Sequence, residues 1–459
     1  MAVAPVSDLQ IEVGSSKIVA PAQAVEHSTL FLSNIDQEAM YKVESVYVFA
    51  ANPERASDDP AEVIEAALAK TLVTYYFLAG RFAPNAKEGR LEVNCNGAGV
   101  LFAAATSKLR LCDLGDLSVP NPAFRSLLVQ PSDSLGLFET PPATFQITRF
   151  KCGGFVFGMT IFHSLMDGVA ITGFFDNLGS IARGGGVVMV PNPNREFLKA
   201  RNPPQPQHYE QLMCRQFRVS SFSEIPLLPF NPTTSSVNNF APEKHVFRSF
   251  PVSSQMISEL KQACLKDETL SRCSSFEAIT AHVLRQVARS RPSDPSALVS
   301  TFLAVDFSRR LQPPPPPNFC GNAVVAACVA ATRQELCTYS LGHFARRVQE
   351  VLSDVDDEYV RSWTDFWELH RIGPARIPIG ACLSAWWKLP FYALDFGWGT
   401  PIFAGPVPNQ LVGFIVIVAN GKNDGGANVY LGLEPQEMAA FEKNIYELAE
   451  SPPLIHAAF

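Results

Sequence analysis

The spacing of apolar and polar positions changes along the first part of the chain, which predicts a mixture of strands and helices. Residues 42–50, KVESVYVFA, are rich in β-branched and aromatic side chains and predict a strand. Residues 59–80 carry apolar side chains at helical spacing between an Asp-Pro start and a glycine stop, and they predict a helix. In residues 90–107 an Asn-Gly pair separates two strand-like runs, which indicates a hairpin.

A further strand pair and helix are predicted next. Residues 144–150 and 154–163 are apolar runs joined by the short KCGG turn. After Gly168 the apolar residues return at the spacing of one helix face, at Ile171, Phe174, Phe175, Leu178 and Ile181. The second strand therefore ends at His163, just before a new helix.

The regular pattern breaks between residues 184 and 245, where Ser, Asn, Pro and Gly dominate. This stretch is longer than an ordinary loop inside one domain, so we interpret it as a crossover with one short helix near 208–216. The predicted organisation is a domain over residues 1–183, a linker over 184–245 and a second domain over 246–459.

Regular patterns return in the second half. We expect helices at 251–265, 274–290 and 435–450, and strands at 297–307, 411–420 and 427–433. The helix at 274–290 opens with Ser274 and has Glu277 three residues later, the spacing of a capping box. Because strands and helices are mixed in both halves, the sequence predicts an α/β fold.

Composition narrows the class of protein. The chain has 459 residues, 47% of them hydrophobic, and a mean hydropathy of +0.07, which suits a folded soluble protein of two or three domains. The net charge is −7 and no cluster of Lys and Arg stands out, so we do not expect nucleic-acid binding. Ten cysteines are spread singly without a CxxC pair, which favours free thiols over disulfides or a metal site.

The N-terminal residues lack a charged segment followed by an apolar one, and no run of about 18 apolar residues occurs. We therefore expect a cytoplasmic protein without a membrane span.

His163 and Asp167 follow the predicted strand in the stretch FHSLMDG. A histidine beside an apolar strand is most often a core residue, but at a strand end before a glycine its side chain can line a cleft. Neutral imidazole can take a proton from an alcohol or amine. The chain has no G-x-S-x-G motif, which would predict a serine nucleophile and a covalent intermediate, so direct transfer is favoured. Asp167 either accepts from the imidazole or turns away and holds the loop through an Arg.

A second candidate motif is DFGWG, at residues 395–399. It combines two glycines and a carboxylate with two aromatic side chains. We interpret it as a structural turn in which Asp395 ties down the backbone and Trp398 is anchored in apolar packing.

Together these motifs resemble those of the BAHD acyltransferases of plants, which move an acyl group from a coenzyme A thioester to an alcohol or amine. HSLMDG matches the HxxxD motif of the family and DFGWG its second signature. HSTLFLSNIDQ, TRFKCGGFVFG, CSSFEAITAHVLR and LAVDFSRR are similar to other family segments, and the likeness runs from about residue 8 to residue 450. Besides His163 and Asp167, the residues of this chain that match the two family motifs are Gly168, Asp395, Phe396, Gly397, Trp398 and Gly399.

The resemblance implies two α/β domains like chloramphenicol acetyltransferase, joined by a long crossover loop and meeting along a central solvent channel. It implies His163 as general base and a structural ion pair between Asp167 and an Arg. The family usually reads V-D-x-R-x-R, whereas this chain reads VDFSRR with Ser308 at the first Arg position. We expect Arg309 to be the partner of Asp167, with Arg310 as the alternative.

The resemblance also suggests binding residues. Ser384 is a candidate oxyanion donor, with a buried structural serine as the equal alternative, and Trp386 lies two residues on. Ser274 and Ser275 open a helix where coenzyme A phosphates could bind, although a plain capping role is the simpler interpretation. Acyl-CoA is then a co-substrate, and we expect no other cofactor, no metal and a monomer.

The acceptor is predicted less narrowly. The sequence is most similar to hydroxycinnamoyl transferases that feruloylate ω-hydroxy fatty acids and fatty alcohols, and an apolar channel would suit such acceptors. A shikimate or quinate acceptor is the alternative, with Arg371 as the cation for its carboxylate. On the strand at 42–50, Ser45 and Tyr47 match acceptor-binding positions, but Val43 replaces a threonine. Acetyl and benzoyl transferases of specialised metabolism also remain open.

The sequence leaves two other classes of function open. The chain could be a catalytically silent relative that binds a small metabolite, and Ser308 is the departure that leaves room for this. It could instead be a serine-type hydrolase, which would release free acid without an acceptor.

Overall fold

The computed structural model describes residues 6–225, 228–229, 244–268, 270–291, 294–370, 375–376, 380–407, 413–422 and 424–447. The chain divides into two units. The first comprises residues 1–199, 315–323 and 389–410, and the second comprises residues 200–314, 324–388 and 411–459.

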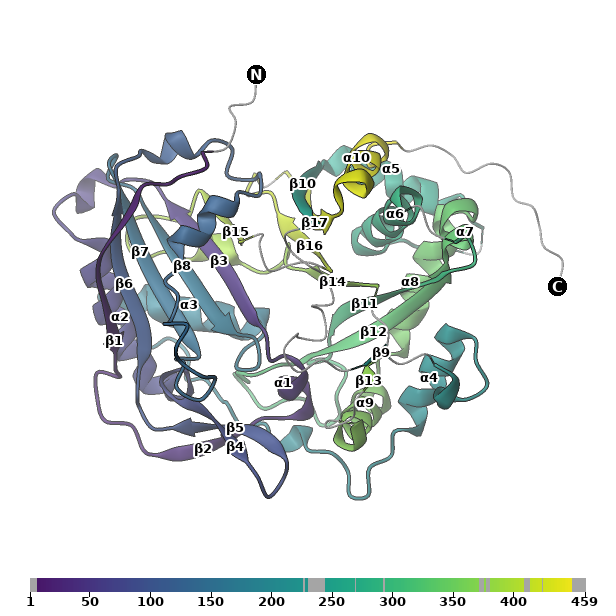
Figure 1. Ribbon diagram of the computed structural model, residues 1–459, viewed down its shortest axis with the longest axis horizontal. Helices are drawn as coiled ribbons and strands as arrows, with labels where there is room; N and C mark the ends of the chain where they lie inside the picture. Colours follow the sequence, from purple (N-terminus) through teal and green to yellow (C-terminus); the bar gives the residue numbers. More distant parts are fainter. Residues whose placement is uncertain are drawn as a thin grey trace. The chain divides into compact units, whose positions relative to one another are not determined.

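The first unit is built around a six-stranded sheet with the order β1-β6-β7-β8-β3-β15, coloured mainly purple and blue in Figure 1. A three-stranded sheet, β2-β5-β4, belongs to the same unit. The elements are β1 (Ile11–Val19), β2 (Ser28–Phe31), α1 (Asn34–Glu38), β3 (Lys42–Phe49), α2 (Pro60–Thr74), β4 (Arg81–Asn85), β5 (Arg90–Cys95), β6 (Val100–Ser107), β7 (Ala143–Phe150), β8 (Phe155–Phe162), α3 (Gly168–Ala182) and β15 (Phe403–Pro406).

Helices α2 and α3 cover one face of this sheet. Their apolar side chains, among them Leu68 and Phe174, share one core cluster with strand residues such as Phe145 and Phe157. The other face carries a second cluster, in which Val46 and Val156 pack with residues of a short 3-10 helix at Pro122–Leu127. Because β3 and β8 are covered on both faces, their burial pattern is almost continuous rather than alternating.

The second unit contains another six-stranded sheet, with the order β10-β17-β16-β14-β11-β12. Helix α6 is buried along nearly its whole length, and α5 and α10 lie beside it in Figure 1. The elements are α4 (Gln207–Phe217), β9 (Leu228–Pro229), β10 (Val246–Val252), α5 (Ser254–Leu265), α6 (Ser275–Ser290), β11 (Leu298–Asp306), β12 (Val324–Thr332), α7 (Arg333–Thr338), α8 (Leu341–Asp354), α9 (Asp357–His370), β13 (Ala375–Arg376), β14 (Ala381–Ala385), β16 (Phe414–Ala419), β17 (Ala427–Leu433) and α10 (Pro435–Asn444).

Several predictions from local pattern are confirmed. β3 and the antiparallel pair β7–β8 form where the sequence predicts strands, and α3 follows Gly168. The capping box is present, because the Ser274 hydroxyl accepts from the Glu277 N–H and the Glu277 carboxylate accepts from the Ser274 N–H. β16 and β17 pair as an antiparallel hairpin around GKNDGG.

The hairpin predicted at 90–107 is wrong. β5 pairs with β2 and β4, whereas β6 pairs with β1 and β7, so the Asn-Gly connection joins two different sheets. Gly97 and Gly99 both have positive φ and turn the chain out of one sheet into the other. The helix expected over 59–80 is also shorter, since α2 ends at Thr74 and a 3-10 turn follows at Tyr76–Ala79.

The units differ from the predicted domain boundaries. The first unit reaches residue 199 and also takes residues 315–323 and 389–410. Residues 389–410 carry DFGWG, which the sequence analysis assigned to the second domain. They belong to the first unit because β15 pairs antiparallel with β3, from Phe403 opposite Val48 to Pro406 opposite Ser45. Long-range backbone pairing of this kind leaves no mark in local hydrophobic pattern.

Within the described residues, no helix has the length and apolar character needed to cross a bilayer. No group of three or more His, Cys, Asp or Glu residues in that part of the chain stands close enough together to hold a metal ion. All ten cysteines are free thiols in the structure.

Candidate active site

His163 is the first residue after β8. Its N–H donates to the carbonyl of Tyr41, at 2.8 Å, which continues the β3–β8 pairing by one step beyond Lys42 and Phe162. Its ring packs against the ring of Tyr41 with centroids 5.1 Å apart. The side chain is half-buried. Two hydrogen-bonded strands therefore deliver the imidazole to the end of the sheet in a fixed backbone position.

The surroundings of His163 favour the neutral imidazole. Burial lowers its pKa below the usual value, opposed in part by hydrogen bonding at its own backbone, by Asn322 and by the charge of Asp36. Nδ1 is buried and has no hydrogen-bond partner among the described residues. A neutral ring is the form that accepts a proton, so the environment suits a general base at neutral pH.

Asn322 lies against the backbone of His163. Its Nδ2 donates to the carbonyl of His163 at 2.8 Å and to Oδ1 of Asp36, also at 2.8 Å. The side chain is buried, and its Oδ1 has no partner among the described residues. The amide thus links the strand end that carries the imidazole to a buried carboxylate from α1.

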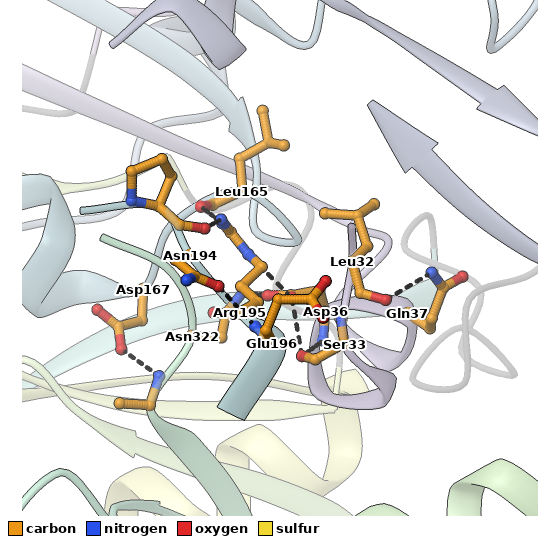
Figure 2. Close-up of polar contacts among 12 residues, drawn as sticks. Leu32, Ser33, Asp36, Gln37, Leu165, Asp167, Asn194, Arg195, Glu196 and Asn322 are labelled. Atoms are coloured by element: carbon orange, nitrogen blue, oxygen red, sulfur yellow. Dashed lines mark hydrogen bonds and ion pairs between the residues drawn. The ribbon is translucent and has the colours of Figure 1, made fainter. Parts of the chain in front are cut away.

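That carboxylate is paired with Arg195. Oδ2 of Asp36 accepts from Nε of Arg195 at 3.0 Å and from the N–H and hydroxyl of Ser33, both at 2.8 Å. The other guanidinium nitrogens donate to the carbonyls of Leu165 and Pro193, each at 2.6 Å. Figure 2 shows Arg195 between Leu165 and Asp36, so one guanidinium ties α1 to the loop that follows His163.

Asp167 is the N-cap of α3. Its Oδ1 accepts from the N–H of Ala170 and its Oδ2 from the N–H of Ala323, both at 2.8 Å, while its own N–H donates to Gly321 at 3.2 Å. Nδ1 of His163 has no partner, so Asp167 does not accept from that nitrogen. These contacts favour loop support over a triad-like role. Arg309 belongs to the second unit, and its pairing with Asp167 stays a prediction.

Gly168 begins α3, and the helix start lies close to another segment of the first unit. A Cβ on Gly168 would come within 2.5 Å of Cδ1 of Leu389. The glycine of HSLMDG therefore allows a close approach between the loop after His163 and the segment that leads to DFGWG.

DFGWG forms a tight turn. Oδ1 of Asp395 accepts from the N–H of Gly397 at 2.7 Å and of Gly399 at 3.0 Å. Both glycines have positive φ, 104° and 90°, which side chains other than glycine rarely adopt. The carbonyl of Asp395 accepts from Arg183, at the end of α3. The motif is thus a turn fastened to the helix that follows Asp167.

The two aromatic residues of the turn are anchors. Phe396 is fully buried against the rings of Phe49 and Phe157. Trp398 packs edge-on against Phe155, and the guanidinium of Arg55 stands 4.3 Å from its ring centroid. This is the structural role that the sequence predicts for the motif.

Two residues of β3 were expected to contact the acceptor. Tyr47 is 1% exposed and its ring packs against Phe157, Phe175 and Phe391, and its contact with the acceptor stays a prediction. Ser45 is also buried, and its hydroxyl has no partner among the described residues. A binding role for Ser45 stays a prediction.

The remaining candidates lie in the second unit. Ser384, on β14, accepts from Nε1 of Trp386 at 3.1 Å, which leaves its own proton available for donation. Ser274 caps α6 and Ser275 is the first helical residue, and their contact with coenzyme A stays a prediction. Arg371 lies outside the described residues.

Three residues around His163 were missed by the sequence analysis as site residues: Asp36, Arg195 and Asn322. Only Asp36 has a local signal, since Ser33 and Asp36 have the spacing of a capping box and form one. Arg195 follows the Pro- and Asn-rich stretch of the expected linker, and Asn322 lies in the loop after the proline run. Neither has a neighbouring pattern that indicates its partner.

Known proteins similar to this chain share most of its length. The model of the Transferase family matches residues 9–448. Omega-hydroxypalmitate O-feruloyl transferase of Arabidopsis thaliana is 32% identical over 96% of this chain and 93% of its own length. Shikimate O-hydroxycinnamoyltransferase of Nicotiana tabacum is 31% identical over 96% of this chain and 100% of its own.

The fold is also found in solved structures. The structure of F. sporotrichioides TRI101 complexed with coenzyme A and T-2 is similar with a TM-score of 0.67, at 16% identity, over 90% of this chain and 97% of that one. At this identity the likeness concerns the fold alone, and it agrees with the expected pair of α/β domains.

Proposed function

Because the chain belongs to the Transferase family, whose plant members are the BAHD acyltransferases, and is itself an acyltransferase, we propose that it transfers a hydroxycinnamoyl group from coenzyme A to a hydroxyl acceptor. The acceptor class that we favour is an ω-hydroxy fatty acid or fatty alcohol. His163 acts as general base in a direct transfer.

The observation that carries this proposal is the placement of His163. His163 directly follows β8, its backbone N–H donates to the Tyr41 carbonyl, and burial lowers the pKa of its imidazole. A neutral imidazole can deprotonate a hydroxyl without a second base, and the fixed backbone keeps the ring in place for that step.

The proposed reaction has one tetrahedral intermediate. Nε2 of His163 takes the proton of the acceptor hydroxyl as its oxygen attacks the thioester carbonyl. The intermediate collapses, the C–S bond breaks, and the leaving thiolate of coenzyme A takes the proton back from the imidazolium. The products are the ester and free coenzyme A, so no oxidant, metal or further cofactor is needed.

Two further roles are part of the proposal. Ser384 donates its hydroxyl to the oxyanion, supported by the Trp386 N–H that it accepts, because a hydroxyl oriented this way has its proton free. Ser274 and Ser275 contact a phosphate of coenzyme A at the start of α6. We expect Ser384→Ala to lower kcat by about 10²–10³-fold.

The choice of acceptor is supported by the names of two similar relatives. A relative named for ω-hydroxypalmitate and one named for shikimate differ by one percentage point of identity, 32% against 31%. The fatty acceptor is favoured by Val43 on β3, because the family resemblance implies a threonine at this position in enzymes that act on shikimate. Shikimate or quinate is therefore the second candidate. The expected cytoplasmic location and monomeric state stay predictions.

The experiment is a donor–acceptor panel with the purified protein. Feruloyl-, coumaroyl-, acetyl- and benzoyl-CoA are each offered with ω-hydroxypalmitate, a fatty alcohol, shikimate and quinate, and both free thiol and product mass are followed. We expect ester from a hydroxycinnamoyl donor and a fatty acceptor, lost in His163→Ala. His208→Ala is the matched control, because it removes an imidazole on α4 of the second unit.

Each other outcome contradicts a defined part of the proposal. Product only with shikimate or quinate would replace the acceptor class. Free acid without an acceptor would indicate a hydrolase. Thiol release that persists in His163→Ala would remove the base, and ligand binding without any thiol release would favour a silent binding protein.

A further inference from the structure

We propose that Asn322 is a positioning residue for the general base, holding the backbone of His163 through its carbonyl. The inference rests on the proposed role of His163 as base and adds the residue that keeps it in place. It is drawn from the contacts around a side chain that no sequence motif singled out.

The orientation of the Asn322 amide is set by its partners. Nδ2 carries two hydrogens, and both are used, one on the carbonyl of His163 and one on Oδ1 of Asp36, each at 2.8 Å. A carbonyl and a carboxylate are acceptors only, so a flipped amide would place oxygen against oxygen twice. The amide nitrogen therefore has one favourable arrangement, and it faces the backbone of the base.

The loop that carries Asn322 is itself anchored to the first unit. The N–H of Cys320 donates to the carbonyl of Asn192 at 2.7 Å, and the N–H of Asn192 donates to Asn318 at 2.8 Å. On either side of Asn322, Gly321 accepts from the Asp167 N–H and Ala323 donates to the Asp167 carboxylate. Three consecutive residues, 321–323, thus hold both ends of the turn between His163 and Asp167.

The second acceptor of Asn322 gives the contact its strength. Asp36 is fully buried and forms an ion pair with Arg195. A hydrogen bond to an ionised group is roughly twice as strong as one between neutral groups. Because the same amide nitrogen bridges Asp36 and the His163 carbonyl, the network from α1 reaches the base through Asn322.

Charged and aromatic groups surround the turn that carries His163. The Asp36–Arg195 ion pair is linked to it through Asn322, and Asp167 caps α3. The uncharged ring of Tyr41 packs against the imidazole. Asp36 favours the imidazolium that forms during proton transfer, since a nearby negative charge stabilises a cation. A shift of the His163 backbone would change both the reach of Nε2 and this field.

The test compares three variants with the wild-type chain. Asn322→Ala removes both donors. Asn322→Asp keeps the shape but donates to neither acceptor when ionised. The pair Asp36→Asn with Asn322→Asp restores a hydrogen bond between positions 36 and 322 and restores the total charge, yet still leaves the His163 carbonyl without its donor.

The matched control is Asn177→Ala. Asn177 is fully buried in the same unit and also bridges several groups, donating to the Met189 carbonyl at 2.7 Å and accepting from the Val188 N–H at 2.8 Å. It separates loss of stability from loss of base positioning, because both truncations remove a buried, bonded carboxamide.

We expect Asn322→Ala to lower kcat by about 10–100-fold per folded molecule, the order expected for a base misplaced by about 1 Å, with KM for donor and acceptor changed less than about threefold. Asn177→Ala should lower the melting temperature but keep kcat. The Asp36→Asn/Asn322→Asp pair should regain melting temperature relative to Asn322→Asp and fail to regain kcat.

Two outcomes would overturn the inference. One is a folded Asn322→Ala protein with wild-type kcat, and the other is recovery of kcat together with stability in the double variant. If His163→Ala is inactive while Asn322→Ala is normal, only this inference fails. If His163→Ala itself stays active, the proposed function fails first.

Discussion

Arg195 and Asp36 form an ion pair in which both side chains are fully removed from solvent, with Nε and Oδ2 3.0 Å apart. The two residues are 159 positions apart in the sequence, and Asn322 links Asp36 to the backbone carbonyl of His163. The guanidinium also bonds the carbonyl of Leu165, two residues after the base.

Breaking this pair should destabilise the first unit. Arg195→Met leaves the Asp36 carboxylate buried and uncompensated, and we expect a loss of about 3–5 kcal/mol in the free energy of unfolding, measured by denaturant titration. The exposed pair of Arg248 and Glu442 is the control, for which Arg248→Met should cost about 0–1 kcal/mol. Equal losses at both sites would show that the buried pair does not hold the loop.

The pH dependence of catalysis should reflect the burial of His163. Its pKa is lowered by burial, so the neutral base persists to lower pH than an exposed imidazole would. We expect kcat/KM to stay level as pH falls to 6.5 and to decline only below the usual imidazole range. A pH–rate profile from 4.5 to 8, corrected for unfolding, measures this. A decline that begins above pH 7 would contradict it.

Asp167 should matter for the loop more than for proton transfer. Asp167→Ala removes the acceptor for two backbone N–H groups, of Ala170 and Ala323, and we expect about 1–2 kcal/mol less stability from the lost N-cap. Activity should fall along with loop order. Asp167→Asn keeps one acceptor oxygen and should lie between Ala and wild type in both melting temperature and kcat. An Asn variant with full stability but no activity would indicate a direct chemical role.

The DFGWG turn should act on stability. Trp398→Ala removes a large buried ring that packs on Phe155, and we expect a cost of about 3–5 kcal/mol. In folded protein, KM should stay within about threefold of wild type, because the turn is fastened to core side chains and to α3. Melting temperature and kinetics on the same preparation test this, and a large KM change with an unchanged melting temperature would place the turn at the substrate.

A pH effect on stability is expected from His282 in the second unit. Burial lowers its pKa to about 4, and its Nε2 lies 2.7 Å from the Ile445 carbonyl. The folded state therefore favours the neutral ring, and stability is lost as pH falls from the unfolded pKa near 6.5 through about 4. The denaturant midpoint of unfolding should be lower at pH 5 than at pH 7 in the wild-type protein. The difference should be smaller in His282→Gln, whose amide can still donate to the Ile445 carbonyl. Equal declines would assign the effect to other groups.

Local pattern was sufficient for much of the fold. β3, β7, β8, α3 and α6 appear where apolar spacing, a glycine or a capping box predicts them, because each depends on residues within a few positions of one another. The hairpin prediction at 90–107 is wrong because it, too, rests only on residues close together in the sequence. Asn96-Gly97 allows a turn, but which strand β6 pairs with depends on β1 and β7, far away in the sequence.

The N-cap role of Asp167 is seen only in the folded chain, whereas the strand end at His163 and the turn tied down by Asp395 are predicted from residues close together in the sequence. The residues that hold these features in place become visible only in the folded chain. Arg195, Asn322 and β15 reach the site across separations of 159 residues or more, and their contacts form because buried hydrogen-bonding groups must find partners wherever the folded chain brings them.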